Sequence, residues 1–120
     1  LPALTKARRI QEKAAGVDFD WVTIQQVYNK IDEELSELKE AVNKKQKDNI
    51  ADELGDVLFT IVNLSRHIKI NPEIALDKSI NKFINRFHKL EQYMKENKLN
   101  FEDQSIKKLD KLWNKIKSIK

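Results

Sequence analysis

The chain has 120 residues, of which 40% are hydrophobic and 35% charged, enough apolar material for the core of one domain. Two glycines, two prolines and no cysteine exclude a β-sandwich or barrel, a glycine-rich phosphate loop, a disulfide framework and thiol catalysis. No apolar run is long enough for a membrane span, so we expect a mostly helical, soluble protein of the cytoplasm with no membrane contact. The formal net charge of +4 comes from a Lys-rich tail over residues 95–120, which is interpreted as a solvated helix face rather than a nucleic-acid site.

Hydrophobic spacing and helix-capping residues predict five helices, three long and two short. They cover residues 4–15, 24–42, 49–69, 72–95 and 106–116. Thr23 and Asp48 are expected N-caps, and Asn71 before Pro72 is typical of a helix start. A polar break is expected over residues 43–47.

The apolar side chains of the long helices recur every three or four residues, which predicts one buried stripe on each. On the second helix the stripe consists of Ile24, Tyr28, Ile31, Leu35, Leu38 and Val42. On the third it consists of Ile50, Leu54, Val57, Leu58, Ile61, Ser65 and Ile68. On the fourth it consists of Leu76, Ile80, Phe83, Phe87, Leu90 and Met94.

The third helix is apolar over a wider arc than one stripe, since Ala51, Phe59 and Val62 lie beside the stripe. A second subunit would cover this extra surface, so a homodimer is predicted. Cover by the short first or fifth helix is the alternative.

Two pairs of carboxylates lie on the shoulders of the predicted buried faces. Glu34 and Glu37 are three residues apart on the second helix, and Glu53 and Asp56 are three apart on the third. Antiparallel packing would bring the pairs together, and four converging carboxylates need protonation, basic partners or bound cations. Oxygen ligands favour Mg²⁺, Mn²⁺ or Ca²⁺, and Mg²⁺ sites are often completed by substrate phosphates. The simpler alternative is a solvated acidic face.

Three further side chains are candidates for binding a nucleotide. Lys82 and Arg86, one turn apart, could hold phosphates or could be ordinary surface cations. Trp113 could pack in the core or stack on a nucleobase. A di-iron carboxylate site is disfavoured, because neither carboxylate pair includes a histidine.

The segments Glu33-Glu34-Leu35-Ser36-Glu37 and Glu53-Leu54-Gly55-Asp56 resemble the EExxE…ExxD signature of the all-α nucleoside triphosphate pyrophosphohydrolases. Within that superfamily the chain is most similar to MazG. Further matching segments are Leu1-Pro2-Ala3-Leu4, Phe19-Asp20-Trp21, Arg66-His67 and Lys82-Phe83. The resemblance covers nearly the whole chain. It implies that residues 1–120 form one MazG-like domain, the C-terminal part of a longer two-domain chain.

The resemblance also implies a homodimeric helical bundle that hydrolyses nucleoside triphosphates (NTP or dNTP) to monophosphate and pyrophosphate with Mg²⁺, or with Mn²⁺ in its place. The implied metal ligands are Glu34, Glu37, Glu53 and Asp56, with Glu34 or Glu37 orienting the attacking water. The implied nucleotide contacts are Lys30, Glu33, Asn49, Lys82, Arg86 and Trp113, with Asn49 standing where some members have lysine. A dUTP- or dCTP-preferring enzyme of the same superfamily and a non-catalytic dimeric regulatory domain are the alternatives.

Overall fold

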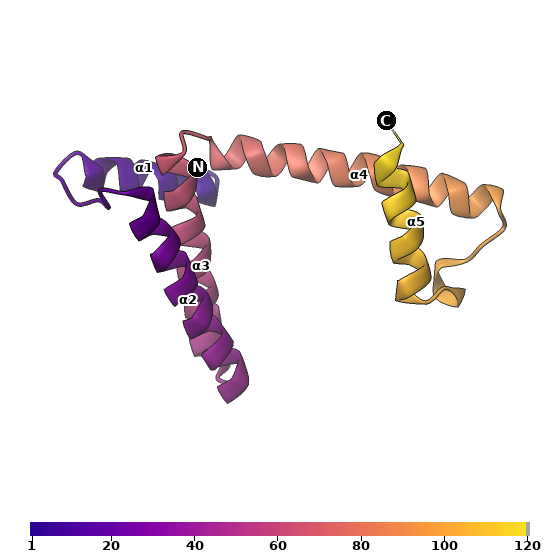
Figure 1. The fold of residues 1–120 in the computed structure, drawn as a ribbon, viewed down its shortest axis with the longest axis horizontal. Helices are drawn as coiled ribbons and strands as arrows, with labels where there is room; N and C mark the ends of the chain where they lie inside the picture. Colours follow the sequence, from indigo (N-terminus) through magenta and orange to yellow (C-terminus); the bar gives the residue numbers. More distant parts are fainter. Residues whose placement is uncertain (120) are drawn as a thin grey trace. The chain divides into compact units, whose positions relative to one another are not determined.

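The computed structural model describes residues 1–119, which form five α-helices, a short 3₁₀ turn and no strand (Figure 1). The helices are α1 (Ala3–Ala15), α2 (Ile24–Lys44), α3 (Lys47–His67), α4 (Pro72–Glu96) and α5 (Ile106–Ser118), with the 3₁₀ turn η1 at Phe101–Asp103. The prediction of an all-α chain with three long and two short helices is therefore confirmed. No helix among these residues combines the length and apolar composition that crossing a membrane requires.

Local capping explains where the helices begin and end. The Thr23 hydroxyl accepts a hydrogen bond from the Gln26 backbone, and the Gln26 side chain accepts one from the Thr23 backbone, which closes a capping box at α2. The side-chain oxygen Oδ1 of Asn71 accepts hydrogen bonds from the backbone N–H groups of Glu73 and Ile74 in the first turn of α4, as predicted. The prediction that Asp48 caps the third helix was wrong. Because Lys45, in the left-handed region (φ 56°), ends α2 and reverses the chain, α3 already begins at Lys47.

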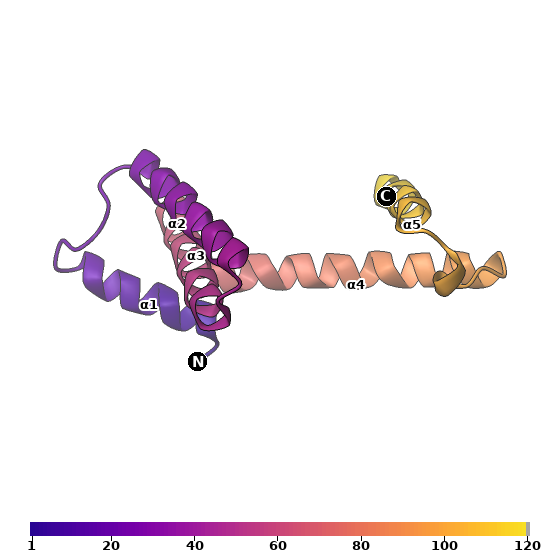
Figure 2. The ribbon, with the colours of Figure 1, turned by 90° about the horizontal axis from the view of Figure 1, so that it is seen from below.

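The chain divides into two compact units, Leu1–Ala75 and the residues from Leu76 onward. In the first unit α2 and α3 form an antiparallel hairpin, and α1 packs against α3 (Figures 1 and 2). In the second unit α5 packs on the last turns of α4. Its core consists of Leu90, Met94 and Ile116, with Leu99, Phe101, Leu109, Leu112 and Trp113 packed against them.

The hairpin buries the predicted stripes only in part, since Ser65 is buried and Ile31, Leu38, Ile50 and Val57 are half-buried. The buried side chains are Val27, Glu34 and Ala41 on α2 and Thr60, Val62 and Ser65 on α3. These six residues define the buried line of the hairpin.

The larger apolar side chains beside that line remain exposed, contrary to the prediction for them. On α2 the exposed members of the stripe are Ile24, Tyr28, Leu35 and Val42, each 38–51% exposed. On α3 they are Leu54, Leu58, Ile61 and Ile68, each 43–51% exposed. On α4 they are Leu76, Ile80, Phe83 and Phe87, each 37–57% exposed, whereas Leu90 and Met94 are buried as predicted.

Candidate metal centre and the adjoining pocket

The α2–α3 hairpin brings three of the predicted metal ligands together. Glu34 and Glu37 lie one turn apart on α2, and Glu53 lies opposite them on α3. One carboxylate oxygen from each lies within 4.8 Å of one oxygen from each of the others. Glu34 is buried, Glu53 is half-buried and Glu37 is exposed, so the group extends from the helix contact to the surface. We call these three residues the acid cluster.

The negative charge of the acid cluster exceeds the positive charge that neighbouring side chains supply. The Lys30 ammonium lies 3.1 Å from Glu34 Oε1 and 3.4 Å from Glu33 Oε2, and its hydrogen bond to Glu34 raises the pKa of Lys30. The negative charge of Glu34, followed by partial desolvation and the charge of Glu53, raises the pKa of Glu37. Repulsion among the carboxylates therefore exceeds what one cation neutralises.

Two buried oxygens of the acid cluster lack any hydrogen-bond donor. Oε2 of Glu34 and Oε2 of Glu53 are inaccessible to solvent and unpartnered. A buried carboxylate oxygen without a donor is costly, and a hard divalent cation would satisfy both the lone pairs and the excess charge. The donor set of three carboxylates fits Mg²⁺ or Mn²⁺.

The other predicted site residues of the first unit lie outside the acid cluster. Asp56 is exposed one turn beyond Glu53 and lies outside the group of three that approach within 4.8 Å. Glu33 and Asn49 are also exposed. Lys82, Arg86 and Trp113 belong to the second unit, where the Trp113 ring packs 5.0 Å from that of Phe83.

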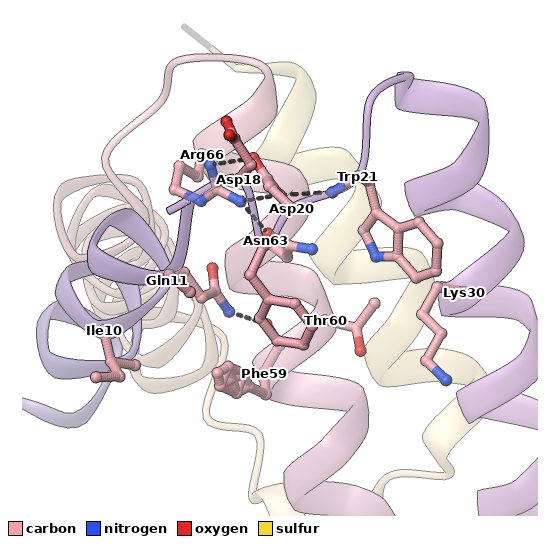
Figure 3. Close-up of a pocket in the computed structure, with 12 residues that line it drawn as sticks. Ile10, Gln11, Asp18, Asp20, Trp21, Lys30, Phe59, Thr60, Asn63 and Arg66 are labelled. Carbon is pink, nitrogen blue, oxygen red and sulfur yellow. Dashed lines mark hydrogen bonds and ion pairs between the residues drawn. The ribbon is translucent and has the colours of Figure 1, made fainter. Parts of the chain in front are cut away.

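A pocket of about 580 Å³ lies in the first unit between α1, the α1–α2 loop, α2 and α3 (Figure 3). Its apolar lining includes Ile10, Phe19, Trp21 and Phe59, and its polar lining includes Gln11, Lys30, Thr60 and Asn63. Figure 3 shows Gln11 on the α1 side, Trp21 and Lys30 on the opposite side, and Thr60 and Asn63 between them. Lys30 thus lines the pocket and also pairs with Glu34 of the acid cluster.

An ion-pair network fixes the α1–α2 loop to the end of α3. Arg66 donates to both carboxylate oxygens of Asp20, through Nη1 to Oδ2 at 2.9 Å and through Nη2 to Oδ1, and His67 Nε2 lies 3.0 Å from Oδ1. The hydrogen bond from Arg66 is the main reason that the pKa of Asp20 falls to about 2. The network holds Asp20 and the neighbouring Trp21 at the edge of the pocket.

Sequence reasoning missed this network and the pocket beside it. Asp20 and Arg66 are 46 residues apart, and helical periodicity relates only residues on the same element. Asp20 lies in the segment Phe19-Asp20-Trp21 and Arg66 in Arg66-His67, both of which resemble the family, but no spacing rule predicts that the two residues pair.

The fold and the acid cluster define an all-α protein with a carboxylate centre suited to a divalent cation. The family model described as "MazG nucleotide pyrophosphohydrolase domain" matches residues 22–91, which include the acid cluster. The chain therefore belongs to the MazG nucleotide pyrophosphohydrolase domain family.

Individual relatives agree with this family. The chain is 49% identical over 117 residues to the nucleoside triphosphate pyrophosphohydrolase/pyrophosphatase MazG of Thermotoga maritima, an alignment that covers 98% of this chain and 45% of the relative. It is 37% identical over 121 residues to the nucleoside triphosphate pyrophosphohydrolase of Escherichia coli K12, again covering 98% of this chain and 45% of the relative. The chain thus spans a little under half the length of these relatives.

Proposed function

We propose that this chain hydrolyses nucleoside triphosphates to the monophosphate and pyrophosphate in the presence of Mg²⁺, with the acid cluster holding the metal. The observation that carries the proposal is the convergence of Glu34, Glu37 and Glu53 with two buried, unpartnered carboxylate oxygens. Family membership supports the reaction class, and the two relatives described above are named for that activity.

Each residue of the proposed site has a distinct task. When bound, Mg²⁺ would neutralise phosphate charge and make a bound water more acidic, and Mn²⁺ could replace it. The Lys30 ammonium pairs with the buried Glu34 carboxylate at 3.1 Å and offsets part of the charge of the cluster. Glu37 is the solvent-facing member of the cluster, so we assign to it the orientation of the attacking water, with Glu34 as the alternative.

The remaining assignments rest on the resemblance to the family. Asp56 is proposed as a fourth metal ligand, and Lys82 and Arg86 as phosphate ligands. Glu33, Asn49 and Trp113 remain predicted nucleotide contacts. The cytoplasmic location, the absence of nucleic-acid binding and the organisation of the chain as one domain of a longer protein also remain predictions.

A homodimer is part of the proposal. The exposed stripes on α2 and α3 have the spacing of buried helix faces, yet the chain leaves their large side chains 38–51% exposed. A second copy packed on these stripes would remove them from water, and burial of such apolar area is the main driving force of association.

Product analysis tests the proposed reaction. The protein is incubated with each common NTP and dNTP, with Mg²⁺ or with EDTA, and the products are separated by anion-exchange chromatography. We expect equimolar monophosphate and pyrophosphate that depend on Mg²⁺, and the ranking of substrates shows whether dUTP or dCTP is preferred. Diphosphate with orthophosphate would contradict the reaction, and no turnover of any nucleotide would favour a non-catalytic regulatory domain.

A further inference from the structure

Lys30 is a cation that pairs with one of the proposed metal ligands. Its ammonium lies 3.1 Å from Glu34 Oε1, one turn away on α2. We propose that Lys30 competes with the metal for Glu34 and leaves it when the phosphates of a nucleotide arrive, so that metal and nucleotide bind cooperatively. This inference rests on the proposed function and adds a task for Lys30 at the metal-free centre.

Lys30 is the cation that the fold itself supplies to the acid cluster. Among residues 1–119, Glu34 forms an ion pair only with Lys30, and neither Glu37 nor Glu53 forms one. An ammonium on Glu34 and a divalent cation in the cluster are therefore attracted by the same carboxylate. Because two cations on one carboxylate repel each other, Lys30 lowers the affinity of the centre for a metal ion that binds alone.

The two oxygens of Glu34 differ in their surroundings. Oε1 is paired with Lys30, whereas Oε2 is buried and has no donor. One oxygen is thus engaged and the other remains for a metal, so Lys30 weakens metal binding without preventing it. The Glu34 side chain is only 9% exposed, so little water screens the repulsion between the ammonium and a bound ion.

Lys30 has a second carboxylate within reach, outside the acid cluster. Glu33 Oε2 lies 3.4 Å from the ammonium, and the side chains of Lys30 and Glu33 are 34% and 57% exposed. The four-carbon stem of lysine is flexible, so the ammonium can move from Glu34 toward Glu33 and toward solvent. Phosphate oxygens that arrive from solvent are strong acceptors for it in this second position.

This exchange of partners couples two binding events. Phosphates at the acid cluster draw the ammonium from Glu34, which leaves the whole charge of Glu34 for the metal. Linkage makes the coupling reciprocal, so a metal that displaces Lys30 from Glu34 also strengthens phosphate binding by the same factor. The centre therefore has a low affinity for a metal ion alone and a higher one for the metal together with its nucleotide.

Binding measurements on the full chain test the competition directly. Lys30→Met keeps an unbranched apolar side chain and removes the charge. Lys44→Met is the matched control, because Lys44 is also on α2 and pairs at 3.0 Å with Glu40, outside the acid cluster. Mn²⁺ affinity without nucleotide is measured by electron paramagnetic resonance, and affinity for the α,β-methylene analogue of ATP in saturating Mg²⁺ by calorimetry. Thermal melts establish that both variants are folded.

We expect Lys30→Met to bind Mn²⁺ alone about threefold or more tightly, and the nucleotide analogue about threefold or more weakly. Lys44→Met should change neither affinity. Unchanged Mn²⁺ affinity in Lys30→Met, a loss of both affinities or a gain in both would each overturn the inference while leaving the proposed reaction intact. If the unchanged protein binds neither Mn²⁺ nor the analogue, the proposed function itself fails, and this inference with it.

The variant Glu33→Gln tests the second position of the ammonium. With Glu33 neutralised, Lys30 stays on Glu34, so Mn²⁺ alone should bind about twofold or more weakly. The same substitution in the Lys30→Met background should have a smaller effect, because Glu33 acts through Lys30. An equal effect in both backgrounds would show that Glu33 acts on the ion directly and would overturn this part of the inference.

Discussion

At the level of single residues, the proposed chemistry depends on three carboxylates that the fold holds together although they repel one another. Lys30 offsets part of their charge, and two buried oxygens still lack donors. A folded protein tolerates such a group when a cation completes it. Two predictions follow from individual side chains, one for the acid cluster and one for the Asp20 network.

The variant Glu53→Gln should lose Mg²⁺-dependent hydrolysis by at least about 100-fold, since it removes a metal ligand and its charge. In EDTA its thermal stability should not fall, because the substitution relieves repulsion among the three carboxylates. Steady-state hydrolysis and a thermal melt measure the two effects. The matched control Asp52→Asn, an exposed carboxylate at the preceding position, should keep full activity. An active Glu53→Gln enzyme would contradict the assignment.

The variant Asp20→Asn should destabilise the protein by about 1–3 kcal/mol at neutral pH, because Arg66 loses a charged, largely buried partner. The pKa of Asp20 is lowered from 3.8 to about 2 on folding. The unfolded state therefore binds this proton more readily, and the stabilising effect of Asp20 is complete above about pH 4 and is lost as the pH falls toward 2. Urea unfolding at pH 6 and at pH 2 measures this, with Asp18→Asn as the exposed control. An equal difference between wild type and Asp20→Asn at both pH values would contradict it.

Sequence reasoning was more successful for the acid cluster than for the pocket, for a physical reason. Glu34 and Glu37 are one turn apart on one helix, and Glu53 is on the next helix along a short hairpin, so local periodicity predicts that they meet. The Asp20–Arg66 pair depends on how α1 and its following loop settle on α3. No periodic rule encodes that packing.

At the level of elements, α2 and α3 show how capping determines where the helices of a hairpin begin and end. Thr23 caps the start of α2 as predicted. The helix extends into the predicted polar break and ends only where Lys45 adopts the left-handed conformation. The predicted stripes are only partly buried, and their larger members on α2 and α3 are 38–51% exposed. Ala41 and Ser65 are buried in the hairpin, Ser65 as a member of the predicted stripe.

Gly55 offers a prediction for α3. It lies inside the helix with an ordinary backbone conformation, and a Cβ built on it meets no atom within 4 Å. Gly55→Ala should therefore stabilise the protein by about 0.5–1 kcal/mol through better helix propensity. Urea unfolding with and without Mg²⁺ measures it. Destabilisation would contradict the prediction and would show that another backbone approaches α3 at this position.

At the level of the whole molecule, the chain exposes more large apolar side chains than its sequence pattern leads one to expect. The stripes on α2 and α3 have the period of buried faces. The hydrophobic pattern is the same whether another part of the chain or a second copy covers them. The proposed homodimer accounts for this surface.

The variant Leu58→Asp places a charge in the exposed stripe of α3, where Leu58 is 51% exposed. If a second copy covers the stripe, burying this unpaired charge is costly, and the dimer should dissociate to monomer at micromolar concentration. Sedimentation velocity measures this. The control Asp52→Asn should remain dimeric. A wild-type chain that sediments as a monomer would contradict the proposed dimer.

The most direct test of the account is whether the acid cluster binds a divalent cation. Mn²⁺ binding is followed by electron paramagnetic resonance in the unchanged protein, in Glu37→Gln, and in Glu40→Gln, a control with an exposed glutamate one turn further along α2. The account predicts that Glu37→Gln weakens Mn²⁺ binding by about tenfold or more, while Glu40→Gln binds as the unchanged protein does. Equal Mn²⁺ affinity in all three proteins would contradict it.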